Sequence, residues 1–311
     1  MKKTFITGII ILIIGGIMLA IGIGQGGVKS IYWDNGLKTD RRTSYSREIK
    51  DVDTINLEGS NYGPIAIHQG NVAKVTVHAQ KSNQIKTRIS GHTLSISGHS
   101  RTHFMFGDFG MDNGSQTIDV TVPKKTQIKT IDNQGEMSLH VSDLTVESLN
   151  STGYGDLNLE NTTVTKEMTM PHQNYGDITM NGVTFDRGLN IDSSGDITIR
   201  NSNFTKADSR VHSADGDVVL NNNRWQNLSV TSASGELNLE DQSVKSTLTA
   251  NADDGDITAH IIPRANLAIH ANSSTGDTSI YGKNRHDYGK VKPNGQSFEL
   301  SSSNGDVTVA Y

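Results

Sequence analysis

Apolar and polar residues alternate in short runs along most of this chain, and the runs recur. Each run follows a glycine and an acidic residue, with apolar residues two and four places after the glycine, as in Gly195-Asp196-Ile197-Thr198-Ile199. Alternation with a period of two predicts short β-strands that bury one face. The pattern recurs at Gly135, Gly155, Gly176, Gly195, Gly216, Gly235, Gly255, Gly276 and Gly305.

The spacing of these glycines stays near about 20 residues up to Gly276, which is typical of repeat architectures. One copy cannot bury its apolar face alone, whereas stacked copies bury all of these faces in one continuous core. We therefore predict an all-β, single-domain parallel β-solenoid (β-helix) of ~20-residue coils, each rising by about 4.8 Å. We expect the glycine at a tight corner, where the acid after it faces solvent.

Two further columns fit this prediction when the copies are aligned on the glycine, an alignment that sets Met137 beside Leu157. Residues that tolerate positive φ stand six places after the glycine and predict a corner: Asn161, Gly182, Asn201, Asn222 and Asp241. Nine places after the glycine stands an apolar residue, predicted to point inward: Leu144, Val164, Phe185, Phe204, Trp225 and Val244.

Residues 1–27 differ from the rest of the chain. Lys2 and Lys3 precede an apolar run long enough to cross a bilayer as a helix. We predict a single-pass signal anchor with a cytoplasmic N-terminus, which places residues 30–311 outside the cell membrane. The alternative is a cleaved signal peptide, but the run exceeds the usual apolar region and no Ala-x-Ala site ends it.

The remaining domain boundaries follow from composition. Residues 28–50 are polar and mixed in charge and are predicted to be a juxtamembrane linker. Residues 51–311 are predicted to form the extracytoplasmic solenoid, with a cap and first coils over 51–131 and regular Gly-Asp coils over 132–311. The regular part contains an insertion at 282–295.

Residues 98–115 interrupt the repeat with an aromatic and methionine-rich stretch. An exposed loop of this composition would suit a partner protein or a membrane surface. The alternative is that these side chains cover the open end of the solenoid, because solenoid ends need caps. The contact residues predicted here are Phe104, Phe106, Phe109 and Met111.

The insertion at 282–295 is basic and is predicted to protrude as a loop. Lys290 and Lys292 are its predicted contact residues, with an anionic envelope polymer as the target. A solvated turn is the alternative.

Charge and cysteine content exclude several classes of function. The net charge of −5 argues against nucleic acid as the main partner. The absence of cysteine excludes disulfides, thiol nucleophiles and cysteine-type zinc sites.

The acids after the glycines form a potential ladder of carboxylates. Calcium is one interpretation, with Asp254 and Asp256 as the candidate ligands. A solvated column of turn residues is the other, because the nine-residue units of calcium-binding β-rolls are missing. Clustered carboxylates also suit a polysaccharide lyase or hydrolase. However, the acids occupy equivalent corners, and catalytic carboxylates need dissimilar environments. We therefore predict no catalytic residue and no cofactor.

Several stretches together resemble a known bacterial family, the "putative adhesin" domain of unknown function that includes LiaG-like envelope proteins. The resemblance rests on Val52-Asp53-Thr54-Ile55-Asn56-Leu57, on Leu94-Ser95-Ile96, on Val120-Thr121-Val122-Pro123 and on the serial Ser-x-Gly-Asp coils. It covers about residues 50–311. It implies a β-solenoid on the outer face of a Gram-positive membrane and, for LiaG-like members, a link to the envelope stress response. The family supplies no ligand and no catalytic motif.

The leading hypothesis is a non-catalytic interaction or scaffold module in the cell envelope, bound to the membrane through its N-terminal helix. Its partner would be an envelope protein or a wall polymer. The alternatives are a surface adhesin that binds host or wall glycan, and the polysaccharide-acting enzyme.

Overall fold

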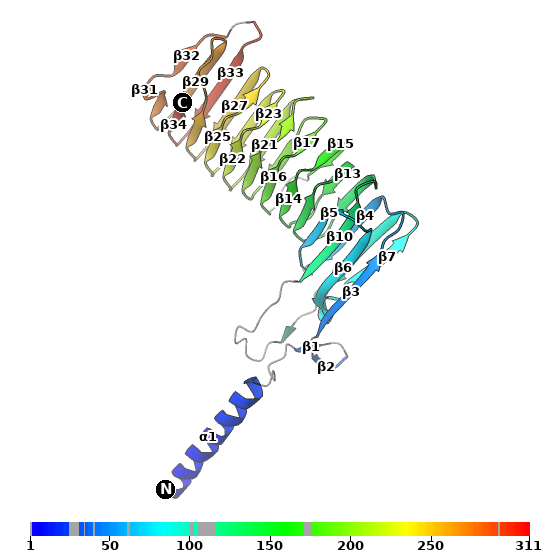
Figure 1. The fold of residues 1–311 in the computed structure, drawn as a ribbon. Helices are drawn as coiled ribbons and strands as arrows, with labels where there is room; N and C mark the ends of the chain where they lie inside the picture. The colour runs from blue at the N-terminus through cyan, green and yellow to red at the C-terminus, as the bar shows by residue number, and fades with distance from the viewer. Residues whose placement is uncertain are drawn as a thin grey trace.

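The computed structural model describes residues 2–24, 31–33, 35–39, 41–60, 63–99, 103–104, 116–170, 176–291 and 293–311. The chain begins with helix α1 (Lys2–Gly24), and a long stack of strands follows it (Figure 1). Judged on its described residues, no helix combines the length and the apolar character that a membrane crossing requires. The single-pass anchor expected from residues 1–27 therefore stays a prediction.

Three sheets run along the stack, and a small fourth sheet lies beside it. Sheet I has fourteen strands, which are in spatial order β3 (Arg42–Glu48), β6 (Lys74–Gln80), β10 (Thr117–Pro123), β5 (Ile65–Gly70), β12 (Leu139–Ser142), β14 (Leu157–Glu160), β16 (Ile178–Asn181), β19 (Ile197–Arg200), β22 (Val218–Asn221), β25 (Leu237–Glu240), β28 (Ile257–His260), β34 (Val307–Ala310), β30 (Thr278–Ile280) and β31 (Lys283–Asn284).

Sheet II has ten strands: β26 (Ser243–Val244), β23 (Arg224–Trp225), β20 (Asn203–Phe204), β17 (Thr184–Phe185), β15 (Thr163–Thr169), β13 (Thr145–Ser151), β11 (Ile128–Asn133), β4 (Thr54–Ser60), β8 (Thr93–His99) and β7 (Lys86–Ser90). Sheet III has seven: β18 (Asn190–Ser193), β21 (Ser209–Ser213), β24 (Leu228–Ser232), β27 (Thr247–Ala252), β33 (Gln296–Ser302), β29 (Leu267–Ser273) and β32 (Asp287–Gly289). The small sheet holds β2 (Leu37–Thr39), β1 (Ile31–Trp33) and β9 (His103–Phe104), and a 3-10 turn, η1 (Lys81–Asn83), follows β6.

The predicted all-β fold of mostly parallel, stacked coils is confirmed. Equivalent residues of successive coils lie side by side, as Leu157 does with Ile178 and Ile178 with Ile197. Their side chains are buried in one core that runs along the stack. The predicted corner column is also confirmed, because its members have positive φ: Asn161 (45°), Gly182 (67°), Asn201 (52°), Asn222 (53°) and Asp241 (52°).

The alignment on Gly135 is wrong by two residues. Leu139, not Met137, lies opposite Leu157 in sheet I. In sheet II, Val146 lies beside Val164 in the inward column, where Leu144 was predicted. The reason is that this coil has two more residues between its glycine and its strand than the following coils have.

The glycines of the repeat serve a different purpose from the one predicted. All nine are described, and none has a positive φ. A Cβ atom on Gly216 would lie 2.4 Å from the carbonyl carbon of Gly195 in the preceding coil, and one on Gly235 would lie 2.1 Å from the carbonyl oxygen of Gly216. Glycine is therefore needed because neighbouring coils approach closely here, whereas the left-handed corners are formed by the column six places after it, from Asn161 to Asp241.

Spatial order departs from chain order at both ends of the stack. The first coil, β4 with β5, lies between the coil of β8 and β10 and the coil of β11 and β12. The last coil, β33 with β34, lies between the coil of β27 and β28 and the coil of β29 and β30. Neither the first nor the last coil in sequence is thus outermost in space.

Antiparallel strands close both ends of the stack. β3 and β7 close one end, and β31 and β32 close the other. The linker prediction is therefore wrong for residues 42–48, which form β3. Since both faces of β3 are polar and only Tyr45 packs on the core, hydrophobic periodicity could not reveal this strand.

Part of the predicted protruding loop packs against the end of the stack. The rings of Tyr281 and Tyr288 meet edge to face, with centroids 4.9 Å apart, and the guanidinium of Arg285 lies 4.8 Å from the Tyr288 ring. Burial raises the pKa of Tyr281 to about 12, and its hydroxyl donates to the carbonyl of Ile261 at 2.8 Å. The segment around β31 and β32 is thus a cap rather than a free loop.

The cross-section of the stack changes along its length. Near α1 the coils have two long sides, because the strands of sheet II from β4 to β15 are six or seven residues long. From β17 onward sheet II keeps only two residues per coil, and sheet III adds a third side. Sheet II ends at β26, while sheets I and III continue through further coils.

Candidate functional site

The acids of the repeat link one coil to the next. The Asp196 carboxylate accepts a hydrogen bond from the backbone N–H of Asp217 at 2.9 Å, and the Asp217 carboxylate accepts one from the N–H of Glu236 at 2.8 Å. The same bond joins Asp156 to Asp177 and Asp177 to Asp196. These carboxylates therefore serve as acceptors for backbone amides along the corner.

Serine residues hold the same corner from inside. The hydroxyl of Ser213 donates to the carbonyl of Gly195 in the preceding coil at 3.0 Å and accepts from the N–H of Gly216 in its own coil at 3.0 Å. Ser232, Ser273 and Ser302 make equivalent pairs of bonds. The Ser-x-x-Gly-Asp pattern is thus a hydrogen-bonding device between coils.

The candidate calcium ligands belong to this corner. The Asp256 carboxylate accepts from the backbone N–H of Asp306 at 2.8 Å, and the Asp254 carboxylate accepts from the side-chain amide of Asn304. Within the part of the chain that the structure describes, no group of three or more His, Asp or Glu side chains is arranged to hold a metal ion.

Two of the predicted contact residues, Phe104 and Lys290, are among the described residues. Phe104 belongs to β9, where it is opposite Ile31 of β1. Phe106, Phe109 and Met111 lie outside the described residues, and so does Lys292. Lys290 is exposed directly after β32. Their roles in binding stay predictions.

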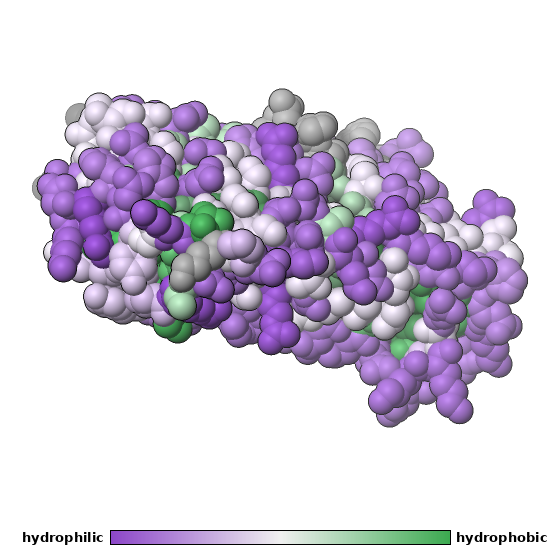
Figure 2. Space-filling view, turned by 90° about the horizontal axis from the view of Figure 1, so that it is seen from above, coloured by the Kyte–Doolittle hydropathy of each residue, from purple (hydrophilic) through white to green (hydrophobic). Residues whose placement is uncertain are grey.

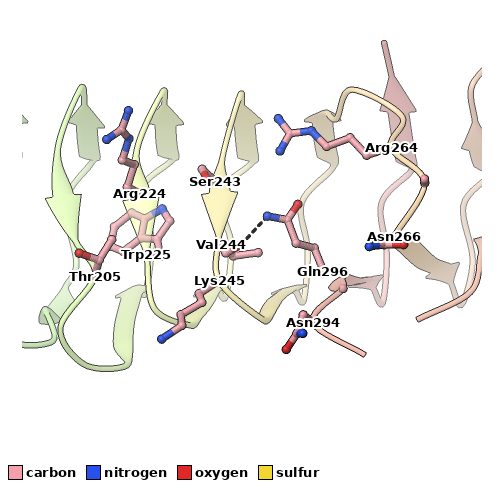
Figure 3. A pocket seen from close by; sticks show the side chains of 12 residues that line it. Thr205, Arg224, Trp225, Ser243, Val244, Lys245, Arg264, Asn266, Asn294 and Gln296 are labelled. Carbon is pink, nitrogen blue, oxygen red and sulfur yellow. Dashed lines mark hydrogen bonds between the residues drawn. The ribbon is translucent and has the colours of Figure 1, made fainter. Parts of the chain in front are cut away.

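A concave site that the sequence did not suggest opens where sheet II ends (Figure 3). This notch has a volume of about 560 Å³ and lies beside β26, with the segments 264–266 and 294–296 on its other side. Its lining includes Arg224, Ser243, Lys245, Arg264, Asn266 and Gln296. The notch exists because the chain crosses this side as a loop after β28 instead of adding another strand to sheet II.

The outer edge of β26 is partly closed by a side chain. The side-chain amide of Gln296 donates to the carbonyl of Val244 at 2.6 Å, drawn as a dashed line in Figure 3. This carbonyl faces the position that a further strand of sheet II would occupy. Trp225 lies beneath the notch with 1% of its surface exposed, stacks on Phe204 at 4.6 Å and donates its indole N–H to Gln242.

Three cationic side chains surround the notch. Arg224, Lys245 and Arg264 are all exposed, and Arg264 extends from its loop toward β26 (Figure 3). Among the described residues, no carboxylate forms an ion pair with any of the three. Asp241, which lines the adjoining hollow, lies with a carboxylate oxygen 2.9 Å from Nδ1 of His260. The notch therefore presents uncompensated positive charge on a chain whose net charge is negative.

One sequence signal could have located the notch. Nine places after Gly235 the inward column holds Val244, but nine places after Gly255 it holds Arg264. An arginine cannot occupy a buried column without a partner, so the change from valine to arginine marks the coil at which sheet II ends. The contribution of Gln296 follows only from the out-of-order stacking of the last coil.

Comparisons with known proteins place the chain in a family. A family model described as Toastrack DUF4097 matches residues 52–310, while no curated protein matches significantly. Among solved structures, a "putative adhesin" from Bacteroides fragilis is 15% identical with a TM-score of 0.37, over 86% of this chain and 97% of that chain. A "putative adhesin" from Parabacteroides distasonis is 14% identical with a TM-score of 0.49, over 86% and 96%. A "putative lipid binding protein" from the same organism is 14% identical with a TM-score of 0.40, over 86% and 97%.

Proposed function

The chain belongs to the Toastrack DUF4097 family, and we propose that it is a non-catalytic interaction module of the cell envelope that binds its partner through the notch. The observation that carries the proposal is the set of three unpaired cations around a concave surface. Binding sites are concave and combine a preformed shape with a few convergent polar groups. A stack of coils linked by repeated hydrogen bonds holds these groups on a rigid frame.

The use of the repeated acids supports a binding rather than a catalytic role. Catalysis by paired carboxylates requires two groups in unlike environments, free to exchange protons with substrate. Here the carboxylates of Asp156, Asp177 and Asp196 accept hydrogen bonds from backbone amides of the next coil. Their place in the sequence is therefore explained by coil stacking.

Helix α1 is proposed to hold the module at the membrane, with the coils on the outer side. Large apolar side chains of α1 are exposed, Ile11 by 66% and Leu12 by 76%, so they need a cover that the coils do not provide. Lys2 and Lys3 favour a cytoplasmic N-terminus. We expect the full chain to remain in the membrane fraction after carbonate extraction. A chain that lacks residues 2–24 should be released, and retention of that shortened chain would contradict the anchor.

Adhesion to a glycan is the second candidate function, and one observation favours it. Polar side chains form a row along the outer face of sheet I, where Asn158 lies beside Thr179 and Thr179 beside Thr198. The molecular surface seen from above in Figure 2 is also mostly hydrophilic, with only scattered apolar areas, and in this view no strand is marked. A flat polar face suits sugar hydroxyls, whereas the notch suits an anion.

Photo-crosslinking in living cells separates the two functions. One probe replaces Ser243 at the notch, and the control probe replaces Asn238 on the outer face of sheet I. An adduct from position 243 and none from 238 would support the notch as the binding surface. Wall-glycan adducts from 238 would favour adhesion through sheet I instead, and no adduct from either position would overturn the proposed function.

A further inference from the structure

We propose that the notch binds consecutive phosphate groups of a linear, flexible poly(phosphodiester) such as an anionic wall polymer. This inference rests on the proposed function, because it names the ligand class of the same surface. Three features of the notch carry it: the type of cation, the spacing of the cations along the stack, and the absence of an exposed aromatic ring among its lining residues.

The type of cation favours phosphate. Two of the three are arginines, Arg224 and Arg264, whose planar guanidinium groups donate paired hydrogen bonds to phosphate oxygens. Lys245 adds a third positive charge. The exposed side chains of Ser243 and Asn266, which also line the notch, supply neutral hydrogen-bond donors. No ion pair within the described residues has to break before an anion enters.

The spacing favours a chain of anions over a single one. Trp225 of β23 and Val244 of β26 lie side by side on neighbouring strands. Arg224 directly precedes Trp225, and Lys245 directly follows Val244. Arg264 extends toward β26 from the loop on the far side of the notch (Figure 3). Because neighbouring strands lie about 4.8 Å apart, the three charges are distributed along the solenoid axis over about two such steps. A volume of about 560 Å³ also exceeds the need of one phosphate group.

Buried aromatic residues argue against nucleic acid as the source of the phosphates. Single-stranded nucleic acids bind through bases stacked on exposed aromatic rings as well as through their backbone. Trp225 is the aromatic residue among those that line the notch, and only 1% of its surface is exposed. A polymer whose repeat unit is small and non-aromatic therefore fits better.

The test uses the full chain in detergent with Trp33→Phe, so that Trp225 is the remaining tryptophan and can be excited selectively at 295 nm or above. The probe is synthetic poly(glycerol phosphate) of defined length, and binding is followed by Trp225 fluorescence and by calorimetry. We expect saturable binding that weakens with salt. The double variant R224Q/R264Q should weaken it at least tenfold, and K245Q should weaken it less. The matched control R210Q, an exposed arginine of β21 on sheet III, should stay within twofold.

The outcomes separate this inference from the proposed function. An affinity for poly(glutamate) equal to that for poly(glycerol phosphate) would overturn the phosphate assignment. Binding to phosphatidylglycerol vesicles alone would overturn it as well. So would an affinity for poly(glycerol phosphate) that is unchanged in R224Q/R264Q. Thermal unfolding of each variant shows whether it is folded. If the probe at position 243 captures a partner while poly(glycerol phosphate) does not bind, only the ligand class is wrong. If both fail, the notch is not a binding site.

Discussion

The regular middle of the stack and its two ends follow different rules. In the middle, each coil contacts the coil before it and the coil after it in the chain, about 20 residues away, as Ile197 lies between Ile178 and Val218. At the C-terminal end, Asp306 donates its backbone N–H to Asp256, 50 residues earlier. The middle is therefore a repeat, whereas each end is a closure between distant segments.

The difference shows how the stack avoids open edges. A solenoid that simply stopped would expose unpaired strands that can pair with other chains. Here the last coil of the sequence is inserted one position inward, and the coil of β29 and β30 becomes outermost, covered by β31 and β32. The ends are thus stabilised by non-local pairing, which the repeat alone would not supply.

The largest expected effect comes from removing residues 296–311. The deletion removes four buried side chains, Phe298, Leu300, Val307 and Val309, worth about 6–12 kcal/mol together at about 1.5–3 kcal/mol each. It also leaves β29 and β30 without their only parallel neighbours among the described strands. Hydrogen exchange should show loss of protection across residues 267–280, while residues 178–240 stay protected. Retained protection in 267–280 would mean that the inserted coil is not what holds this end.

The second comparison sets a glycine of the middle against one of the end. Gly216→Ala places a methyl group 2.4 Å from the backbone of Gly195, and neither backbone can move without shifting a coil. We expect a loss of about 3 kcal/mol or more in the free energy of unfolding. Gly282 has φ +68° but open space around it, so Gly282→Ala should cost only about 1–2 kcal/mol. Urea unfolding of both variants measures the difference, and equal losses would contradict the close-approach explanation.

The same contrast explains how far the sequence predicts the structure. The alternation of apolar and polar residues after each Gly-Asp pair predicted the strands of sheet I. The column six places after the glycine predicted the left-handed corners. Both predictions succeed because they follow from local chemistry. Strand β3 was missed since its faces are both polar, and the coil at Gly135 was misaligned by its two extra residues.

The notch was missed for a non-local reason. Lys245 and Arg264 lie in neighbouring coils, but Gln296 reaches Val244 only because the last coil is inserted between two earlier ones. Spacing along the chain carries no information on that insertion. The arginine at position 264 was a visible sign, but recognising it requires knowing that the inward column is buried in the preceding coils, up to Val244.

A smaller effect is expected from the serine column. Ser213→Ala removes two hydrogen bonds and leaves the N–H of Gly216 without its acceptor, so we expect a loss of about 1–3 kcal/mol. The opposite substitution can be tested at Ala252, which lies in the serine column between Ser232 and Ser302. Ala252→Ser should stabilise the fold by about 0.5–1.5 kcal/mol. Thermal unfolding measures both, and a destabilised Ala252→Ser would show that the column tolerates no hydroxyl there.

The smallest effect concerns pH at the N-terminal end, where His68 of β5 lies 2.9 Å from the Asp119 carboxylate of β10. Burial lowers the pKa of His68, but the hydrogen bond to Asp119, the bond to the Gln69 carbonyl and the negative charge of Asp119 outweigh it, so the pKa is raised above 6.5. Protonated His68 therefore stabilises the folded chain fully below pH 6.5, and this contribution is lost as the pH rises through the raised pKa. Because the pair is partly exposed, we expect less than about 1 kcal/mol. Urea unfolding at pH 5.5 and pH 8 should show this decrease in the native chain and a smaller one in His68→Gln. An identical decrease in both would assign the pH dependence to other groups and leave the closure of this end to its strand pairing alone.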